Sequence, residues 1–150
     1  MSFPMSLGDP IRAADARAAA DRAGALLARD PRVRLVFLFG SAADPARAEV
    51  RDLDLAVLTE PALDLDGLLR LRADLVAAVG TPIDLVSIND APIVLAHEIA
   101  DSGRCLFAAS PDIEVDFVVR ARARYLDWQP FREEQWRQAG ERIEDRRRGA

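Results

Sequence analysis

The stretch VFLFGS at residues 36–41 decides the fold, together with DLDLAV at residues 52–57, which begins eleven residues after Ser41. The first stretch ends a run of β-branched and aromatic residues (33–40) that is typical of a buried strand. The second alternates polar and apolar residues at its start, which predicts another strand over 52–59. The sequence therefore places a Gly-Ser pair at the end of one strand and two aspartates at the start of the next.

Strands and helices alternate along the rest of the chain. Strands are expected over 82–89 and 104–109, and helices over about 9–29, 64–79 and 92–101, with a last helix from 112 that Pro130 ends. This alternation predicts an α/β fold, in which helices pack on a small mixed β-sheet. The length fits a single domain over residues 1–150, with a core at about 30–110 and C-terminal helices at about 111–148.

Composition excludes several classes of protein. The 150 residues carry a formal net charge of −5, which disfavours a general nucleic-acid binder, so no direct nucleic-acid binding is expected. All twenty basic residues are arginine, which excludes chemistry that depends on lysine. The N-terminus lacks the pattern of a signal peptide, no run is long and apolar enough for a membrane span, and Cys105 is the single cysteine. A cytoplasmic protein without a membrane partner is expected.

Two aspartates lie at strand spacing in DLDLAV. Residues i and i+2 of a strand point to the same face, so Asp52 and Asp54 share one face while Leu53 and Leu55 point toward a core. Two neighbouring carboxylates repel each other unless a cation lies between them, and Mg²⁺ prefers oxygen ligands. Such pairs are also common on wet surfaces, so this pair alone is a weak signal.

A third aspartate strengthens the interpretation. Asp84 lies in PIDLV at residues 82–86, with apolar neighbours on both sides, where a carboxylate is costly unless it is exposed, paired or bound to metal. If its strand lies beside the 52–59 strand, three carboxylates converge. Three carboxylates on one face suit a pair of metal ions that hold the attacking and leaving oxygens of a phosphoryl or nucleotidyl transfer.

Gly40 and Ser41 provide the complementary half of such a site. Backbone N–H groups at the end of a strand and the start of a helix are unpaired, and glycine lets a phosphate approach the backbone closely. Ser41 adds a hydroxyl donor. A phosphate site beside three carboxylates is what metal-dependent transfer from a nucleoside triphosphate requires.

The pattern FGS-x10-DLD, with IDL thirty residues after it, resembles the nucleotidyltransferase superfamily typified by DNA polymerase β. Within that superfamily the chain is most similar to the minimal nucleotidyltransferases (MNT), which are antitoxins of HEPN-domain toxins. The resemblance implies the polymerase β-like fold. It also implies that Gly40 and Ser41 hold the β and γ phosphates of ATP, that Asp52 and Asp54 bind two Mg²⁺ ions, and that Asp84 binds the catalytic ion and helps to deprotonate the acceptor.

The function implied by this resemblance is a protein adenylyltransferase. Members of the subgroup transfer AMP from ATP to a tyrosine of the partner HEPN toxin and so silence it. The loop between Ser41 and Asp52 departs from the family pattern, because an expected Arg-Gly and a serine before the first aspartate are missing. Arg47 or Arg51 are candidates for the missing phosphate contact, although a solvated arginine is the simpler reading of each.

Two other functions remain open. The altered loop is compatible with an antitoxin that neutralises its partner by binding alone. A nucleotidyltransferase that acts on a small molecule, such as an aminoglycoside, is the other alternative, although 150 residues leave little room for an acceptor domain. A homo-oligomer that formed an acceptor pocket between its copies would fit that alternative.

Overall fold

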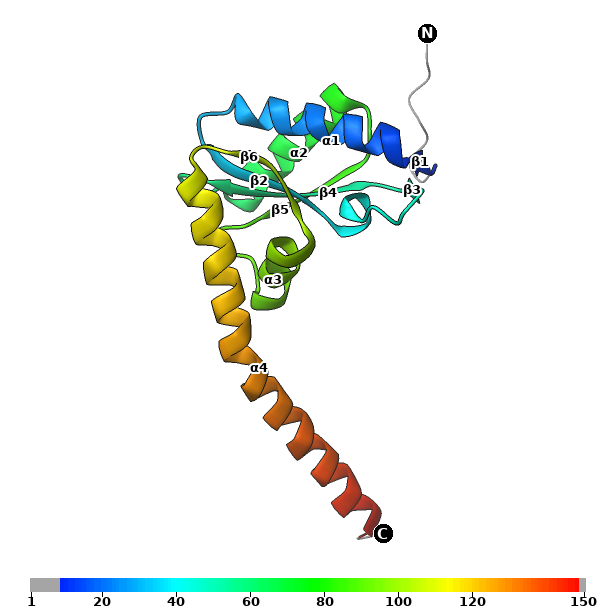
Figure 1. Ribbon diagram of the computed structural model, residues 1–150, viewed down its shortest axis with the longest axis vertical. Coiled ribbons are helices and arrows are strands. Elements are labelled where there is room, and N and C mark those ends of the chain that lie inside the picture. Colours follow the sequence, from blue (N-terminus) through cyan, green and yellow to red (C-terminus); the bar gives the residue numbers. More distant parts are fainter. Residues whose placement is uncertain (1–8, 149–150) are drawn as a thin grey trace.

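A four-stranded mixed sheet forms the centre of the protein, in a computed structural model that describes residues 9–148 (Figure 1). Its strand order is β5-β4-β2-β6, and its strands are β2 (Val33–Phe39), β4 (Leu53–Thr59), β5 (Ile83–Ser87) and β6 (Arg104–Ala108). β4 and β5 are parallel, whereas β2 is antiparallel to both β4 and β6. The predicted α/β class with a small mixed sheet is confirmed.

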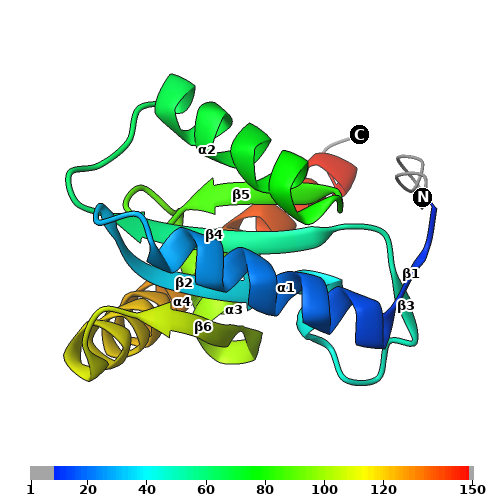
Figure 2. The ribbon, with the colours of Figure 1, turned by 90° about the horizontal axis from the view of Figure 1, so that it is seen from above.

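Helices cover both faces of this sheet (Figures 1 and 2). α1 (Ala13–Ala28) and α2 (Leu65–Val79) pack on the face formed by Val36, Leu38 and Leu55. α3 (Ile93–Ser102) and α4 (Pro111–Arg148) pack on the other face, against Phe37 and Ala56. Because β2 is covered on both sides, its sequence is almost continuously apolar instead of alternating.

The segment between Ser41 and Asp52 is irregular. It begins with a single 3-10 turn (Gly40–Ala43) and ends in the two-residue strand β3 (Glu49–Val50), which pairs with β1 (Ile11–Arg12). The backbone N–H of Ala13 also donates to the carbonyl of Ala48, at 2.9 Å. The start of α1 therefore holds the loop that follows Gly-Ser, an attachment that the sequence did not predict.

α4 corrects one prediction, because a single helix of 38 residues runs through Pro130 where the sequence predicted an end and separate C-terminal helices. Proline removes one backbone hydrogen bond, but the neighbouring turns keep theirs. Beyond it, Arg137 pairs with Glu134 and Glu141, at 2.6 and 2.7 Å, which supports the helix. The second half of α4 extends away from the sheet (Figure 1). Within residues 9–148 no helix combines the length and the apolar character that crossing a membrane requires.

Candidate functional site

The Gly-Ser turn and two of the aspartates meet at one edge of the sheet. Phe39, the last residue of β2, pairs with Asp54, and Asp54 pairs across β4 and β5 with Asp84. Asp54 thus lies between the start of the Gly40 turn and the carboxylate of Asp84. Convergence of the aspartates required that the strand of Asp84 lie beside the strand of Asp54, and β5 does pair with β4.

The three aspartates differ in their exposure. Asp54 is half-buried within β4, and Asp52 is half-buried in the bend just before that strand. Asp84 is exposed, which is how β5 tolerates a carboxylate between the buried side chains of Ile83 and Leu85. On the opposite face of β4, Leu53 and Leu55 are fully buried, as the alternation predicted.

The pKa of Asp54 is perturbed by its surroundings. Its pKa is raised from 3.8 to about 6, first by burial and then by the negative charges of Asp52, Asp84 and Glu98. Asp52, Asp84 and Glu98 therefore all lie near enough to Asp54 to disfavour its charged form. A cation beside Asp54 would relieve the repulsion and lower the pKa of Asp54.

Glu98 was missed by sequence reasoning. It lies on α3, which packs beneath the sheet, and it shares a cleft of about 540 Å³ with Gly40, Ser41 and Arg47. The sequence predicted a helix over 92–101, but no motif links Glu98 to the aspartates. Only the packing of α3 brings this fourth carboxylate to the site.

Gly40 is required by its backbone and by its neighbour. Its φ is +69°, in the left-handed region that favours glycine, and a Cβ placed on it would overlap Oδ2 of Asp54. The chain therefore turns directly against a carboxylate, which leaves the backbone of residues 40–41 open to the cleft. Any larger residue would have to displace Asp54.

Arg47 is the better placed of the two candidate arginines. It lines the cleft that contains Gly40 and Ser41, and a second cleft of about 560 Å³ that contains Ser41 and Asp52. Within residues 9–148 its one ion pair, with Asp44 at 4.0 Å, is long and exposed. Arg51 lines the second of these clefts but not the first. An arginine that borders both sides of Ser41 can reach an anion bound there.

The residues at this edge suit a divalent cation by their chemistry. Carboxylate oxygens are the ligands that Mg²⁺ prefers, and the mutual repulsion around Asp54 favours a cation. In the part of the chain that the structure describes, no three His, Cys, Asp or Glu side chains are gathered closely enough to hold a metal ion. The donor types therefore fit, while the side chains would have to turn toward a common ion.

Comparison with known proteins extends this description. Residues 23–112 match the family described as Polymerase beta, Nucleotidyltransferase. A relative named protein adenylyltransferase MntA, from Shewanella oneidensis, is 31% identical over 103 residues, which cover 69% of this chain and 73% of the relative. The family match over residues 23–112 includes Gly40, Ser41 and the three aspartates.

Solved structures agree in fold. One, a toxin-antitoxin with AMP-PNP, has a TM-score of 0.70 and 26% identity, and the match covers 79% of this chain and 97% of that chain. Another contains a tri-AMPylated Shewanella oneidensis HEPN toxin in complex with MNT antitoxin. It has a TM-score of 0.66 and 27% identity over 83% of this chain and 98% of that chain.

Proposed function

Because this chain is a nucleotidyltransferase of the polymerase beta family, we propose that it transfers AMP from ATP to a tyrosine hydroxyl of a HEPN-domain partner and so acts as that partner's antitoxin. The observation that carries this proposal is the register of the sheet, which places Asp54 between the Gly40 turn and Asp84. That arrangement combines a phosphate site with acidic groups, as nucleotidyl transfer requires.

Two Mg²⁺ ions would be held by the carboxylates of Asp52, Asp54 and Asp84. When bound, they neutralise the charge that builds up on the phosphate oxygens during the transfer. The raised pKa of Asp54 supports this assignment, because a group crowded by like charges gains from a cation. The exposed position of Asp84 leaves its carboxylate open to an incoming acceptor.

The other residues position the reactants. The backbone N–H groups and the hydroxyl of Gly40-Ser41 donate to the β and γ phosphates, and Arg47 adds a positive charge beside them. Asp84 accepts the proton of the tyrosine hydroxyl. The tyrosine oxygen then forms a bond to the α phosphorus, the bond from that phosphorus to its bridging oxygen breaks, and pyrophosphate leaves. No covalent intermediate on this chain is needed.

The relatives support the choice of nucleotide and partner. The name of the Shewanella relative is protein adenylyltransferase, and one similar structure contains an ATP analogue. The partner in another similar structure is an AMPylated HEPN toxin. These names support ATP as the substrate of this chain and a HEPN-domain protein as its acceptor.

Label transfer tests the proposal. The chain would be co-expressed with the protein encoded by its neighbouring gene, purified, and supplied with Mg²⁺ and ATP labelled on the α phosphate. We expect label on the partner, and loss of that label in Asp54→Asn. Asp66→Asn, on α2 far from the site, is the matched control and should label as the wild type does. An unlabelled partner in the wild-type reaction would refute the proposal.

A binding-only antitoxin is the second candidate, favoured by the altered loop after Ser41 and by the separated carboxylates. Neutralisation in cells discriminates between the two. If Asp52→Asn with Asp54→Asn still protects cells from the partner, neutralisation does not depend on AMP transfer. If protection is lost while the doubly substituted chain still binds the partner, the enzymatic account holds.

A further inference from the structure

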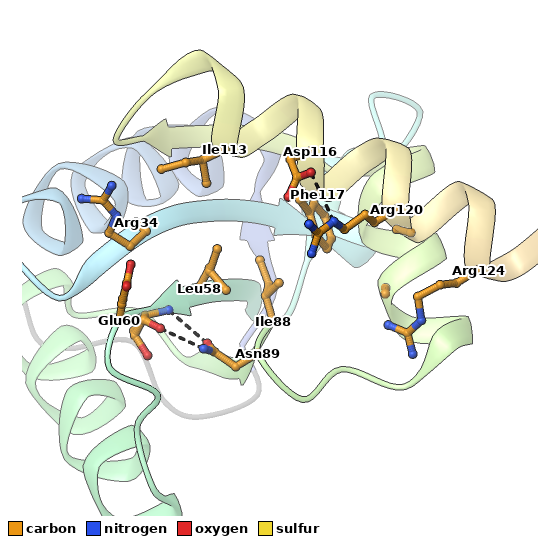
Figure 3. Close-up of a pocket in the computed structure, with 13 residues that line it drawn as sticks. Arg34, Leu58, Glu60, Ile88, Asn89, Ile113, Asp116, Phe117, Arg120 and Arg124 are labelled. Atoms are coloured by element: carbon orange, nitrogen blue, oxygen red, sulfur yellow. Dashed lines mark hydrogen bonds and ion pairs between the residues drawn. The ribbon is translucent and has the colours of Figure 1, made fainter.

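A separate cleft, of about 560 Å³, opens at the end of the sheet opposite the aspartates (Figure 3). Its floor comes from the far ends of the strands, where Leu58 belongs to β4 and Ile88 follows β5. α4 forms one wall with Ile113 and Phe117. Since Asp54 lies at the other end of β4, an occupant of this cleft would not displace a nucleotide.

The floor of this cleft is apolar and offers few polar atoms. Ile88 is buried and Leu58 is half-buried, and Phe117 packs its ring against Phe37 with centroids 5.5 Å apart. The side-chain amide of Asn89, at the rim of the cleft, accepts from the backbone N–H of Thr59 and donates to its carbonyl, at 3.0 and 2.8 Å. The cleft therefore suits an apolar group and provides little for a polar one.

Arginines surround its mouth. Figure 3 shows Arg120 and Arg124 on α4 and Arg34 across the cleft on β2. Arg120 pairs with Asp116 at 3.2 Å, whereas neither Arg34 nor Arg124 forms an ion pair with any residue in 9–148. Glu60 and Asp116 also line the mouth, so its three arginines exceed its carboxylates by one charge, in a chain whose net charge is −5. The mouth therefore favours an acidic group beside the apolar one.

The open rim favours a protein over a small molecule. Glu60, Asn89, Asp116, Arg120 and Arg124 line the mouth and are all exposed. A small ligand is normally buried over most of its surface, which such a rim does not achieve. An apolar side chain inserted from a larger surface gains the burial of the floor, while neighbouring acidic residues meet the arginines.

We propose that this cleft docks an acidic segment of the partner protein, with one of its apolar side chains inserted between α4 and the end of the sheet. The identity of that partner as a HEPN-domain protein rests on the proposed function. Docking at this end leaves the aspartates free at the other. The wall on α4 also lies beyond residues 23–112, so it is outside the segment that matches the family.

Charge reversal on α4 tests this docking. Arg122 and Arg124 are both exposed on the same helix, but only Arg124 lines the cleft, because two residues correspond to about 200° around a helix. We expect Arg124→Glu to weaken binding of the HEPN-domain partner at least tenfold in calorimetry without ATP, and Arg122→Glu to change it less than twofold. Arg34→Glu, on β2, should weaken binding as Arg124→Glu does.

Several outcomes would overturn the docking proposal. Equal affinities for Arg124→Glu and Arg122→Glu would do so, as would a wild-type chain that does not bind the partner. A wild-type dimer that Arg124→Glu converts to a monomer in light scattering would assign the cleft to a second copy instead. A small molecule retained by the wild type in native mass spectrometry, and lost in Arg124→Glu, would assign it to that ligand.

The same proteins separate this inference from the proposed function. Arg122→Glu should label the partner as the wild type does, whereas Arg124→Glu should need a higher partner concentration for half-maximal labelling, because only Arg124 lines the cleft. If the wild type binds the partner with the expected sensitivity to Arg124→Glu but transfers no label, the proposed function fails and the docking inference stands. If label is transferred but Arg124→Glu and Arg122→Glu bind the partner with equal affinity, the docking inference fails and the proposed function stands.

Discussion

Gly40 lies directly against the carboxylate of Asp54, so closely that a Cβ at residue 40 would overlap Oδ2. The turn after β2 and the acidic strand β4 are therefore one unit. A phosphate that binds the backbone at residues 40–41 is brought to the aspartates by this contact. Gly80 has a similar backbone, with φ +75° against +69° for Gly40, but no atom lies within 4 Å of the position of its Cβ.

The two glycines provide a matched pair of substitutions. Gly40→Ala and Gly80→Ala should each lower the free energy of unfolding by about 1–2 kcal/mol, since alanine is strained in the left-handed region. Gly40→Ala should also reduce AMP transfer at least tenfold, because its methyl group displaces Asp54. Urea unfolding and label transfer measure the two effects. Equal transfer by the two variants would show that the contact with Asp54 has no role in catalysis.

The pKa of Asp54 predicts how stability depends on pH without metal. Because its pKa is about 6 in the folded chain and 3.8 as the ordinary value, the folded state binds more protons between these two values. The free energy of unfolding should therefore fall as the pH rises from about 4 to 7. The loss is roughly 1–2 kcal/mol, after allowance for the partial exposure of the side chain.

Asp54→Asn is the control for this dependence. Asparagine cannot ionise, so urea unfolding of the variant should show a flatter profile over the same pH range and greater stability at pH 7. Addition of Mg²⁺ at pH 7 should stabilise the wild type more than Asp54→Asn. Parallel pH profiles for the two proteins would mean that burial and the neighbouring carboxylates do not raise the pKa of Asp54 in the folded chain.

Arg47 is predicted to contribute to nucleotide binding. Arg47→Ala should raise the KM for ATP about fivefold to twentyfold with a smaller change in kcat, because one exposed charge beside a triphosphate is removed. Arg70→Ala is the matched control, since Arg70 pairs with Asp66 at 3.1 Å on α2, away from the cleft. Steady-state kinetics would measure the KM for ATP of both variants. Equal KM values would show that Arg47 is a solvated arginine without a role in nucleotide binding.

The sequence predicted most of the fold and the positions of the aspartates. The family and the mixed sheet are confirmed, because apolar strands such as β2 and the alternation in β4 reflect burial directly. The roles of Gly40, Ser41 and the aspartates stay predictions. Glu98 could not be predicted, since its place near Asp54 depends on how α3 packs beneath the sheet.

Two-residue strands and a proline inside a helix were the other features beyond sequence reasoning. β1 and β3 are too short to show a periodic pattern, and they pair only because α1 starts beside the loop after Ser41. Pro130 is a statistical signal for the end of a helix. It is overridden here because the turns on either side still form their own hydrogen bonds and ion pairs.

The distal half of α4 is predicted to unfold independently of the sheet. The last ring contacts near the domain are those of Tyr125, which stacks on His97 with centroids 3.7 Å apart and touches Trp128. From residue 132 onward almost every described side chain is exposed. Pro130→Ala should restore a backbone hydrogen bond and slow hydrogen exchange over about 127–134, while the melting temperature of the protein stays within about 2 °C. A melting temperature raised by several degrees would show instead that the distal half and the sheet unfold as one unit.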